Sequence, residues 1–594
     1  MDAPPPPSHQ QEKSNSIIGS KLLLFSIGPV QPLIAAARST RDLWSGSYLL
    51  STLAATGLHE LQKASATIIF PDSKKHPLIT LQAPSNQLHQ PDLPTLLTPS
   101  LPNRFLALIP PALDPLDIAK SIRKKLKDIA EKITASITSI DHKNRFTFDH
   151  NLFLKQTTQI LEIHWQTLPI DTSTQWGDQN SKTAQLLDGT KALRTFDARH
   201  TGEWKSGHTY LKDQLNGKEE AIFTVSNKLS ESEIEKLSTD LRLNKQGLKP
   251  GEILGATTLI KRFWPSFYLT TLTGLPNDPD QLRKAHPMPN THAIAQGSSE
   301  ESDKSDTAAQ KDKGNKYFAI LAMDGDEMGQ WVSGKKFTTP ITQNDHTEFS
   351  KILNDFALNC AARIVSKHKG KLIYAGGDDI LAMLPASTAL TCARELRDAF
   401  IQIFTEKDTH KYTSIDASIG LAIAHFKSPL QDLVRTAQTA EKKAKQATKK
   451  GGHGRSAIAI SILKRSGEIL EWGTKWTSPG HRLLKHLIQD LDSQNLNSRF
   501  PHKLEAQLTP YLPQSQSITS DTAFEKNFPH ILEKEITHTL SRNEGGQLGE
   551  TQLENFTEYW NSLNGDFPHK LQLLINILRT AAWMTPNKNL KSQI

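Results

Sequence analysis

Residues 376–379 read Gly-Gly-Asp-Asp and lie between two short apolar runs, which limits what this part of the chain can form. The runs are residues 372–375 and 380–384, and two β-rich segments joined by a glycine-containing turn predict a β-hairpin. Glycine tolerates positive φ and lets a ligand approach the backbone closely. Packing gives no reason for two adjacent carboxylates at a hairpin tip, whereas Mg²⁺ beside a triphosphate needs hard oxygen ligands. The tip is therefore a candidate metal site.

A second acidic cluster, residues 324–326, follows the continuous apolar run 317–323. Such a run is typical of a strand buried on both faces. A carboxylate at the end of a central strand, opposite the hairpin tip, can hold a divalent cation from the other side. We therefore expect Asp324, Asp378 and Asp379 to converge as metal ligands.

The order of elements around these acids predicts a ferredoxin-like fold. Helical periodicity covers about residues 346–368 and 387–405, and a further strand is predicted from 413 to 424. With the first strand and the hairpin, the order is β-α-β-β-α-β, which nucleic-acid polymerase palms and nucleotide cyclases share. The fold alone is an analogy, so the placed carboxylates are what indicate a site.

Each candidate residue also has a purely structural explanation. Glycine and aspartate are common in ordinary hairpin turns, and Asp326 and Glu327 rank below Asp324 because they fit a solvated turn. In the predicted helix 429–450, Glu441 and Lys445 form an i,i+4 pair on an exposed face. Lys445 is the one lysine there that we also consider a triphosphate contact.

The whole chain has 594 residues, enough for about four domains. A net charge of +8 and a pI of about 9.1 favour contact with nucleic acid without proving it. Two cysteines exclude a disulfide framework and a four-cysteine zinc site, and they indicate a reducing, cytoplasmic location. No run of 18 apolar residues predicts a membrane helix, and the proline-rich N-terminus is not a signal peptide.

Changes in composition divide the chain into segments and give the predicted fold class, α+β. We expect two ferredoxin-like, nucleotide cyclase-like palm domains with a helical insert and a C-terminal helical domain. The first palm-like copy is degenerate and poor in carboxylates. The predicted boundaries are a disordered tail at 1–19, the first palm-like domain at 20–190, the insert at 191–285, a flexible linker at 286–315, the second palm at 316–461 and the C-terminal helical domain at 462–594.

Several motifs in the same order resemble the large subunit of type III-B (Cmr-type) CRISPR effector complexes. The resemblance runs from about residue 20 to the C-terminus. The motifs are Ile27–Gln31, Ala37–Tyr48, Pro102–Phe105, Lys261–Pro265, Met323–Gly329, Tyr374–Asp379, Ser418–Gly420, Ala424–Lys427 with Pro429-Leu430, and Ala440–Lys445.

The resemblance implies a function that the bare sequence does not give. Such subunits assemble with other Cmr-type proteins around a guide crRNA, and pairing with target RNA activates a palm that joins ATP into cyclic oligoadenylate. By position, Asp324, Asp378 and Asp379 are implied to bind Mg²⁺ or Mn²⁺. The resemblance further implies that the Gly376-Gly377 backbone and Lys445 approach the triphosphate, while Gly46 and Ser47 border a second ATP; a helix-terminal turn explains the last two residues equally well.

The sequence departs from this family in two respects. Many members carry an HD nuclease domain, but no histidine here is followed by aspartate, so we predict a variant without HD nuclease activity. The insert usually holds a cysteine zinc site, but residues 205–208 read Lys-Ser-Gly-His where cysteines are expected. We therefore predict no zinc and an insert held by packing alone.

Three other functions remain open at this stage. The palm can join AMP to S-adenosylmethionine instead of closing a ring, as some relatives without the HD domain are thought to do. It can be a catalytically silent scaffold within the ribonucleoprotein, although a silent palm would be expected to lose its carboxylates. A free-standing diguanylate-type cyclase fits less well, because Asp379 is followed by Ile380 and not by an acid and an aromatic residue.

Overall fold

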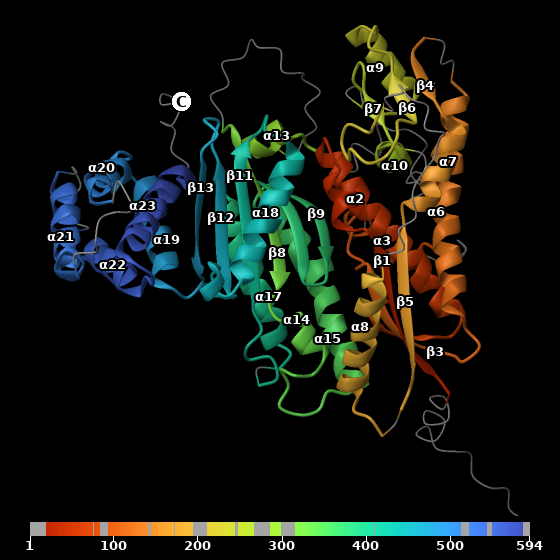
Figure 1. The fold of residues 1–594 in the computed structure, drawn as a ribbon, viewed down its shortest axis with the longest axis horizontal. Helices are drawn as coiled ribbons and strands as arrows, with labels where there is room; N and C mark the ends of the chain where they lie inside the picture. The colour runs from red at the N-terminus through yellow and green to blue at the C-terminus, as the bar shows by residue number, and fades with distance from the viewer. Residues whose placement is uncertain are drawn as a thin grey trace, which may run out of the picture.

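The computed structural model of the protein describes residues 19–74, 76–82, 93–140, 144–171, 173–193, 211–243, 247–266, 286–298, 315–408, 410–512, 522–542 and 549–585. Within these residues the chain forms two large β-sheets, a small third sheet and a group of C-terminal helices (Figure 1). The predicted disordered tail lies outside the described residues, apart from Gly19.

The N-terminal region folds around a four-stranded antiparallel sheet. Its elements are β1 (Lys21–Gly28), α2 (Gln31–Ala35), α3 (Thr40–Lys63), β2 (Thr67–Phe70), α4 (Pro77–Thr80), α5 (Leu93–Leu96), β3 (Arg104–Ile109), α6 (Pro115–Thr138), β5 (Glu162–Pro169) and α8 (Trp176–Ala192). The strand order is β2-β3-β1-β5. Apolar β1 is buried on both faces: Leu23 and Phe25 belong to the core formed with α3 and α6, and Leu22 packs with Leu187 of α8.

This region is ferredoxin-like, as the fold prediction expects, because β1, α3, β2, β3, α6 and β5 follow the β-α-β-β-α-β order. After β1 the chain does not form one continuous helix over residues 32–41. The chain forms only the short α2 there and then breaks. Helix α3 begins at Thr40, where Ser39 and Asp42 form a capping box that accounts for the new start.

The second sheet has six strands in the order β13-β12-β11-β8-β10-β9. The elements of this region are β8 (Tyr317–Gly325), α14 (Met328–Val332), α15 (Gln343–Asp355), a π-helical segment (Phe356–Ala361), α16 (Ala362–Lys367), β9 (Lys371–Gly376), β10 (Asp379–Pro385), α17 (Ala389–Thr405), β11 (Ala417–His425), α18 (Leu430–Lys445), β12 (Ala457–Leu463) and β13 (Ile469–Lys475). The four strands β11, β8, β10 and β9 pair antiparallel in the ferredoxin-like order, which confirms the predicted fold.

The same sheet extends beyond the predicted end of the palm at residue 461. Helix α18 carries the chain across the sheet, so that β12 returns parallel to β11, and β13 then pairs antiparallel with β12. The prediction that the chain is helical from residue 462 is therefore wrong for β13. Its alternating burial pattern is that of a half-covered strand, a pattern too short to dominate the helical periodicity after it.

The two ferredoxin-like regions share one apolar core. Residues of β1 and α3 belong to the same buried cluster as Ile320 of β8, Leu381 of β10 and Val434 of α18. Direct contacts join α3 to β9 and α2 to α18. In Figure 1, α2 and α3 lie between the two large sheets. Helices α2 and α3 of the first region therefore pack against α18 and against strand β9 of the hairpin in the second region.

The insert is not purely helical, contrary to the prediction. Its elements, with those that precede it, are β4 (Phe146–Phe148), α7 (His150–Gln159), β6 (Phe223–Val225), α9 (Glu231–Asp240), β7 (Ile253–Leu254) and α10 (Ala256–Trp264), and the strands pair in the order β4-β6-β7. Packing alone does not hold it either. Asp213 accepts a hydrogen bond from the Gly255 amide (2.6 Å), and Glu219 accepts one from the Thr257 amide (2.9 Å), so carboxylates cap α10. Residues 205–208, on which the zinc prediction rests, lie outside the described residues.

The predicted flexible linker contains an ordered helix. Its described part includes α13 (Thr291–Gln296), whose residue Ile294 is buried. Asn290 caps the start of this helix, and Gly297, at φ +72°, ends it. Residues 299–314 lie outside the described part. After β13 the chain forms α19 (Pro479–Asp492), α20 (Phe500–Leu508), α21 (Thr522–Ser541), α22 (Gly549–Ser562) and α23 (Phe567–Met584), consistent with the predicted helical C-terminus. Among the described residues, no helix has both the length and the apolar character needed to cross a membrane.

Candidate metal and nucleotide site

The Gly-Gly-Asp-Asp sequence forms the turn of the hairpin between β9 and β10. Asp379 lies opposite Gly376 in the ladder, so Gly377 and Asp378 are the two turn residues. Gly377 has a φ of +85°, a conformation that favours glycine. A Cβ atom at Gly376 would overlap the hydroxyl group of Tyr374. The backbone conformation therefore favours glycine at 377, the Tyr374 side chain favours it at 376, and the turn carries the two carboxylates at its end.

The structure brings Asp324 together with Asp378 and Asp379. Strand β10 runs beside β8 with Ile380 opposite Met323, so the hairpin turn ends next to the residue that follows Met323. One carboxylate oxygen from each of the three aspartates lies within 4.8 Å of the others. Gly325 makes this approach possible, because a Cβ atom there would lie 2.9 Å from the Cβ of Asp378.

Burial and the proximity of the acids raise the proton affinity of the two hairpin aspartates. Removal of hydration by surrounding protein atoms, followed by the nearby Asp324 charge, raises the pKa of Asp378 to about 8. The same burial, then the charges of Asp378 and Asp324, raise the pKa of Asp379 well above its usual value. Asp324 and Asp378 are half-buried, and Asp379 is exposed to solvent. A group of carboxylates that repel one another at the edge of solvent is the arrangement that a divalent cation relieves.

Lys445 gives this acidic cluster its nearest positive charge. It is the last residue of α18 and pairs with the Asp324 carboxylate, while its Nζ donates to the Gly325 carbonyl (2.9 Å). Its Nζ also lies 3.6 Å from the Glu441 carboxylate. Burial, the largest cause, raises the pKa of Glu441 to about 7, and Asp324 adds to the shift. The predicted i,i+4 pair therefore exists, but it faces the site and not open solvent.

Asp326 and Glu327 point to other partners, so only Asp324 of the upstream cluster joins the hairpin acids. Asp326 is buried and accepts hydrogen bonds from the Ser418 hydroxyl (2.8 Å) and the Ser456 amide (2.7 Å). Glu327 pairs with Lys336. Asp326 is thus a structural residue that ties β8 to its neighbours and not the solvated turn residue that its sequence context suggests.

Asp324 and Asp379 border a cavity of about 520 Å³ between the two ferredoxin-like regions. Helix α2 and its N-cap supply Val30, Gln31 and Ile34 on one side. The second region supplies residues of β8, the hairpin and α18 on the others. These are Ala322, Met323, Asp324, Tyr374, Asp379, Ile380, Leu381, Gln438, Glu441, Lys442, Lys445, Gln446 and Arg455. The cavity is acidic at the hairpin, basic near the end of α18 and apolar along α2.

The structure does not place Gly46 and Ser47 in this lining, and it also excludes the helix-terminal turn considered for them. Both lie within α3, where Ser47 is fully buried and its hydroxyl donates to the Leu43 carbonyl (3.2 Å). A nearby sequence motif contains a residue that does line the cavity. Gln31 belongs to the quoted 27–31 motif and does line the cavity, but nothing in a single sequence distinguishes a helix face that meets a distant domain.

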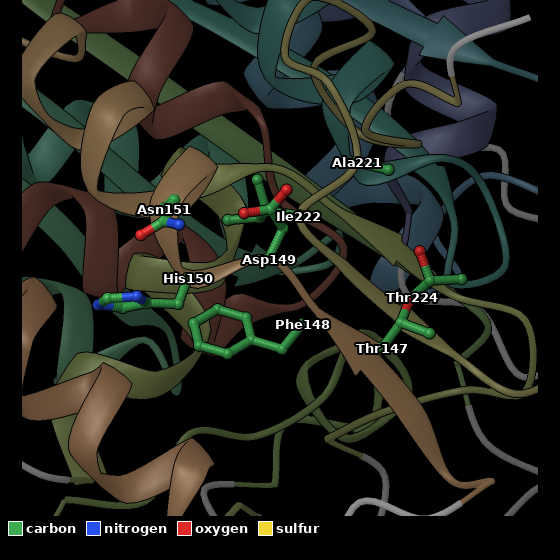
Figure 2. A pocket seen from close by; sticks show the side chains of 8 residues that line it. All are labelled: Thr147, Phe148, Asp149, His150, Asn151, Ala221, Ile222 and Thr224. Carbon is green, nitrogen blue, oxygen red and sulfur yellow. The ribbon is translucent and has the colours of Figure 1, made fainter. Parts of the chain in front are cut away.

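A second cavity, of about 440 Å³, lies where α7 begins beside β4 and β6 (Figure 2). Its lining includes Phe148, His150 and Thr224. Asp149 also lines it, but its carboxylate accepts a hydrogen bond from the Leu152 amide (2.9 Å) and so caps α7. This cavity has no converging set of acids or bases, and no predicted site residue lines it.

Replacing Gly420 by alanine should disturb the site through α18. A Cβ atom on Gly420 would overlap backbone atoms of Ala437 and Glu441, so α18 would have to move away from β11. We expect about 1–3 kcal/mol of destabilisation and displacement of Lys445, detectable as a lower melting temperature and lower activity. Gly189→Ala is the matched control, because its new Cβ meets nothing within 4 Å. Equal behaviour of the two variants would contradict the tight β11–α18 contact.

Comparison with known proteins identifies this architecture. The family model described as "Cas10/Cmr2, second palm domain" matches residues 317–453, which contain the acids, the hairpin and α18. A second model, "CRISPR-associated protein Cmr2, N-terminal", matches residues 22–135. Both segments therefore resemble the Cas10/Cmr2 family. The two models cover the first sheet up to α6 and most of the second, and the chain has the fold class that the sequence predicts.

Curated Cas10/Cmr2 relatives match over part of their length. The chain is 37% identical over 183 residues to "CRISPR system Cmr subunit Cmr2" of Pyrococcus furiosus, which covers 27% of this chain and 20% of that protein. It is 30% identical over 144 residues to the Cmr2 subunit of Saccharolobus solfataricus, covering 22% of this chain and 12% of that protein. The matches thus span a fifth or less of these relatives' own length.

A solved structure agrees over nearly the whole chain at the level of fold. It is titled "Type III-B Cmr-beta Cryo-EM structure of the Apo state", and it matches with a TM-score of 0.66 and 14% identity over 95% of this chain and 82% of that chain. A structure titled as Cmr-beta bound to cognate target RNA gives a TM-score of 0.63, with 14% identity over 95% and 83% of the two chains. This chain therefore shares its fold with those proteins.

Proposed function

We propose that this chain is the large subunit of a type III-B CRISPR RNA-guided effector complex. Its second palm is a metal-dependent nucleotidyltransferase that makes a cyclic oligoadenylate from ATP after target RNA binds. The observation that carries the proposal is the group of three aspartates, within 4.8 Å of one another, at the edge of a cavity that both ferredoxin-like regions line. Such a complex would contain other Cmr-type subunits, guide crRNA and target RNA, and would act in the cytoplasm.

The donor set fits Mg²⁺ or Mn²⁺. Asp324, Asp378 and Asp379 offer only carboxylate oxygens, which these hard cations prefer. The raised pKa values of Asp378 and Asp379 reflect lost hydration and, after it, a repulsion between carboxylates that a cation would remove. They would be its ligands. When bound, the cation lowers the pKa of an attacking hydroxyl group and neutralises the charge on a triphosphate and its leaving group.

The chain's other residues would bind and orient the nucleotide. Lys445 is fixed between the Asp324 carboxylate and the Gly325 carbonyl, so its ammonium group lies beside the acids and would contact phosphate oxygens bound there. Arg455 and Lys442 line the same cavity and supply further positive charge. The apolar side chains of Val30 and Ile34 in the opposite wall would contact the nucleoside and exclude water.

Product analysis tests this proposal. The reconstituted complex would be incubated with target RNA, labelled ATP and Mg²⁺, with and without S-adenosylmethionine, and its products separated by chromatography and mass spectrometry. We expect cyclic oligoadenylate that depends on target RNA and on Mg²⁺. A conjugate of AMP and S-adenosylmethionine would replace the proposed reaction by the alternative one. The absence of any nucleotide product would favour the silent scaffold.

A further inference from the structure

The structure contains a buried charge that the proposed chemistry does not use. Lys261 belongs to α10 in the insert, and only 1% of its surface is exposed. Its ammonium Nζ donates to the main-chain carbonyls of Leu33 (2.6 Å), Ile34 (3.2 Å) and Ala36 (2.5 Å). These three acceptors lie at the C-terminal end of α2, a helix far from Lys261 in the sequence.

Without these hydrogen bonds, both the carbonyl groups at the end of α2 and the Lys261 ammonium group would be left unpaired. The last carbonyls of a helix have no partner within it, and a lysine at that end interacts favourably with them. A buried ammonium group is costly unless it is fully hydrogen-bonded. Burial is the main cause that lowers the pKa of Lys261, to about 8, which shows how little water reaches it. The end of α2 and the charge of Lys261 therefore stabilise one another.

Helix α3 forms the socket for this lysine. A Cβ atom on Gly46 would lie 3.0 Å from Lys261 Cε and 3.3 Å from the Leu33 carbonyl oxygen, so only glycine leaves room at this position without displacement. The Ser45 hydroxyl donates to the Lys261 carbonyl (2.5 Å), and Trp264 Nε1 donates to the Ser45 carbonyl (3.2 Å). Two motifs that are separate in the sequence, around residues 44–47 and 261–265, are thus parts of one contact.

A neighbouring ionic network fixes α10 against α3. Arg262 Nε lies 2.9 Å from Asp42 Oδ1, and Arg262 Nη1 lies 3.2 Å from Glu252 Oε1. Arg38 also pairs with Glu252 (2.7 Å). All but Arg38 are buried. These ion pairs hold α10 in place, and the Lys261 side chain extends from α10 to α2.

Helix α2 is the wall that the first region contributes to the site. Its residues Gln31 and Ile34, with Val30 before them, line the cavity opposite Asp379 and Lys445. We infer that Lys261 is a positioning residue, which holds α2 so that this wall closes on the nucleotide bound at the acidic cluster. The inference rests on the proposed function, and it makes the insert part of the nucleotide site even though no residue of α10 lines the cavity.

Lys261→Met tests the inference, because it keeps an apolar stem of similar length but cannot donate hydrogen bonds. In the reconstituted complex we expect the KM for ATP to rise about tenfold with a smaller change in kcat, since charged hydrogen bonds contribute about 1.5–3 kcal/mol and the acids are untouched. Gly46→Ala should change KM in the same direction by displacing Lys261. The double variant should be no worse than the more affected single variant. Lys218→Met, an exposed lysine of the same insert, is the control and should leave KM unchanged.

Two further readouts make the result decisive. The melting temperature distinguishes a variant in which α2 has moved from one that has unfolded. If Lys261→Met does not fold, the Gly46→Ala variant alone tests the inference. Equilibrium binding of Mg·ATP to the purified chain, measured by calorimetry, does not depend on turnover. Weaker binding in both variants would therefore support the inference even if the wild-type complex makes no product. Unchanged ATP affinity in a folded variant, or additive effects in the double variant, would overturn it.

Discussion

Replacing both Asp378 and Asp379 by asparagine should lower the rate of ATP conversion by about a thousandfold or more, while the protein stays folded. Asparagine has nearly the same shape but lacks the negative charge that a divalent cation requires. A bound cation contributes several kcal/mol of charge stabilisation in the transition state, and roughly 4 kcal/mol corresponds to a thousandfold in rate. Steady-state formation of labelled product by the target-bound complex, with circular dichroism of the variant, provides the measurement.

Two further variants distinguish loss of chemistry from loss of structure. Asp432→Asn removes an exposed carboxylate in the first turn of α18 and should leave the rate unchanged. Asp326→Asn should act differently from the hairpin variant, because Asp326 accepts hydrogen bonds from Ser418 and Ser456, and its loss should lower the melting temperature. A hairpin double variant that stays folded and retains wild-type rates would contradict the assignment of the acids.

Removing divalent cations should destabilise the protein at pH 8.5 and much less at pH 6. The pKa of Asp378 is raised to about 8 in the folded protein, above its value of 3.8 in the unfolded chain. Between these values the folded state binds more protons, so in the metal-free protein this group's contribution to stability falls as pH rises towards 8 and is lost above it. A cation can bind only the ionised carboxylates, so its stabilising effect grows over the same pH range.

Differential scanning fluorimetry with EDTA, Mg²⁺ or Mn²⁺ at a series of pH values measures this effect. At a cation concentration about a hundred times its Kd, the expected stabilisation is about 2.7 kcal/mol, or roughly 5–10 °C for a domain of this size at pH 8.5. The Asp378→Asn/Asp379→Asn variant should show little response to the cation, and its melting temperature should depend less on pH. A cation response that is equal in wild type and variant would place the bound ion elsewhere.

The sequence was sufficient for the parts of the site that local patterns encode. Strand β8 is a continuous apolar run, and the hairpin is marked by glycines between two apolar runs, so the elements and the acids at their ends follow from short-range chemistry. The meeting of Asp324 with the hairpin then follows from the ferredoxin-like strand order, which places β10 directly beside β8.

The opposite wall of the cavity could not be predicted in the same way. Helix α3 is buried along most of its length and contains Ser45, Gly46 and Ser47, so it lacks the two-sided pattern that identifies a surface helix. Gly46 resembles a turn residue in the sequence, whereas in the structure it makes room for Lys261, which lies 215 positions further along the chain. The contacts of α2 with α18 are equally distant in sequence, and no local period records them.

The shorter elements were missed for a related reason. Strands β6 and β7 have three and two residues, and their pairing with each other and with β4 depends on partners distant in the chain. Helix α13 lies next to a polar, small-residue segment that dominates the composition of residues 286–315. In each case tertiary contacts, and not intrinsic preference, decide the local structure.

Crystals of the protein grown with Mn²⁺ and ATP, and measured for anomalous scattering at the manganese edge, test the central claim most directly. We expect one or two anomalous peaks within about 2.1–2.3 Å of carboxylate oxygens from Asp324, Asp378 and Asp379, with Lys445 directed at the triphosphate. Nucleotide bound without manganese at these three side chains, or manganese held by other residues, would contradict the account.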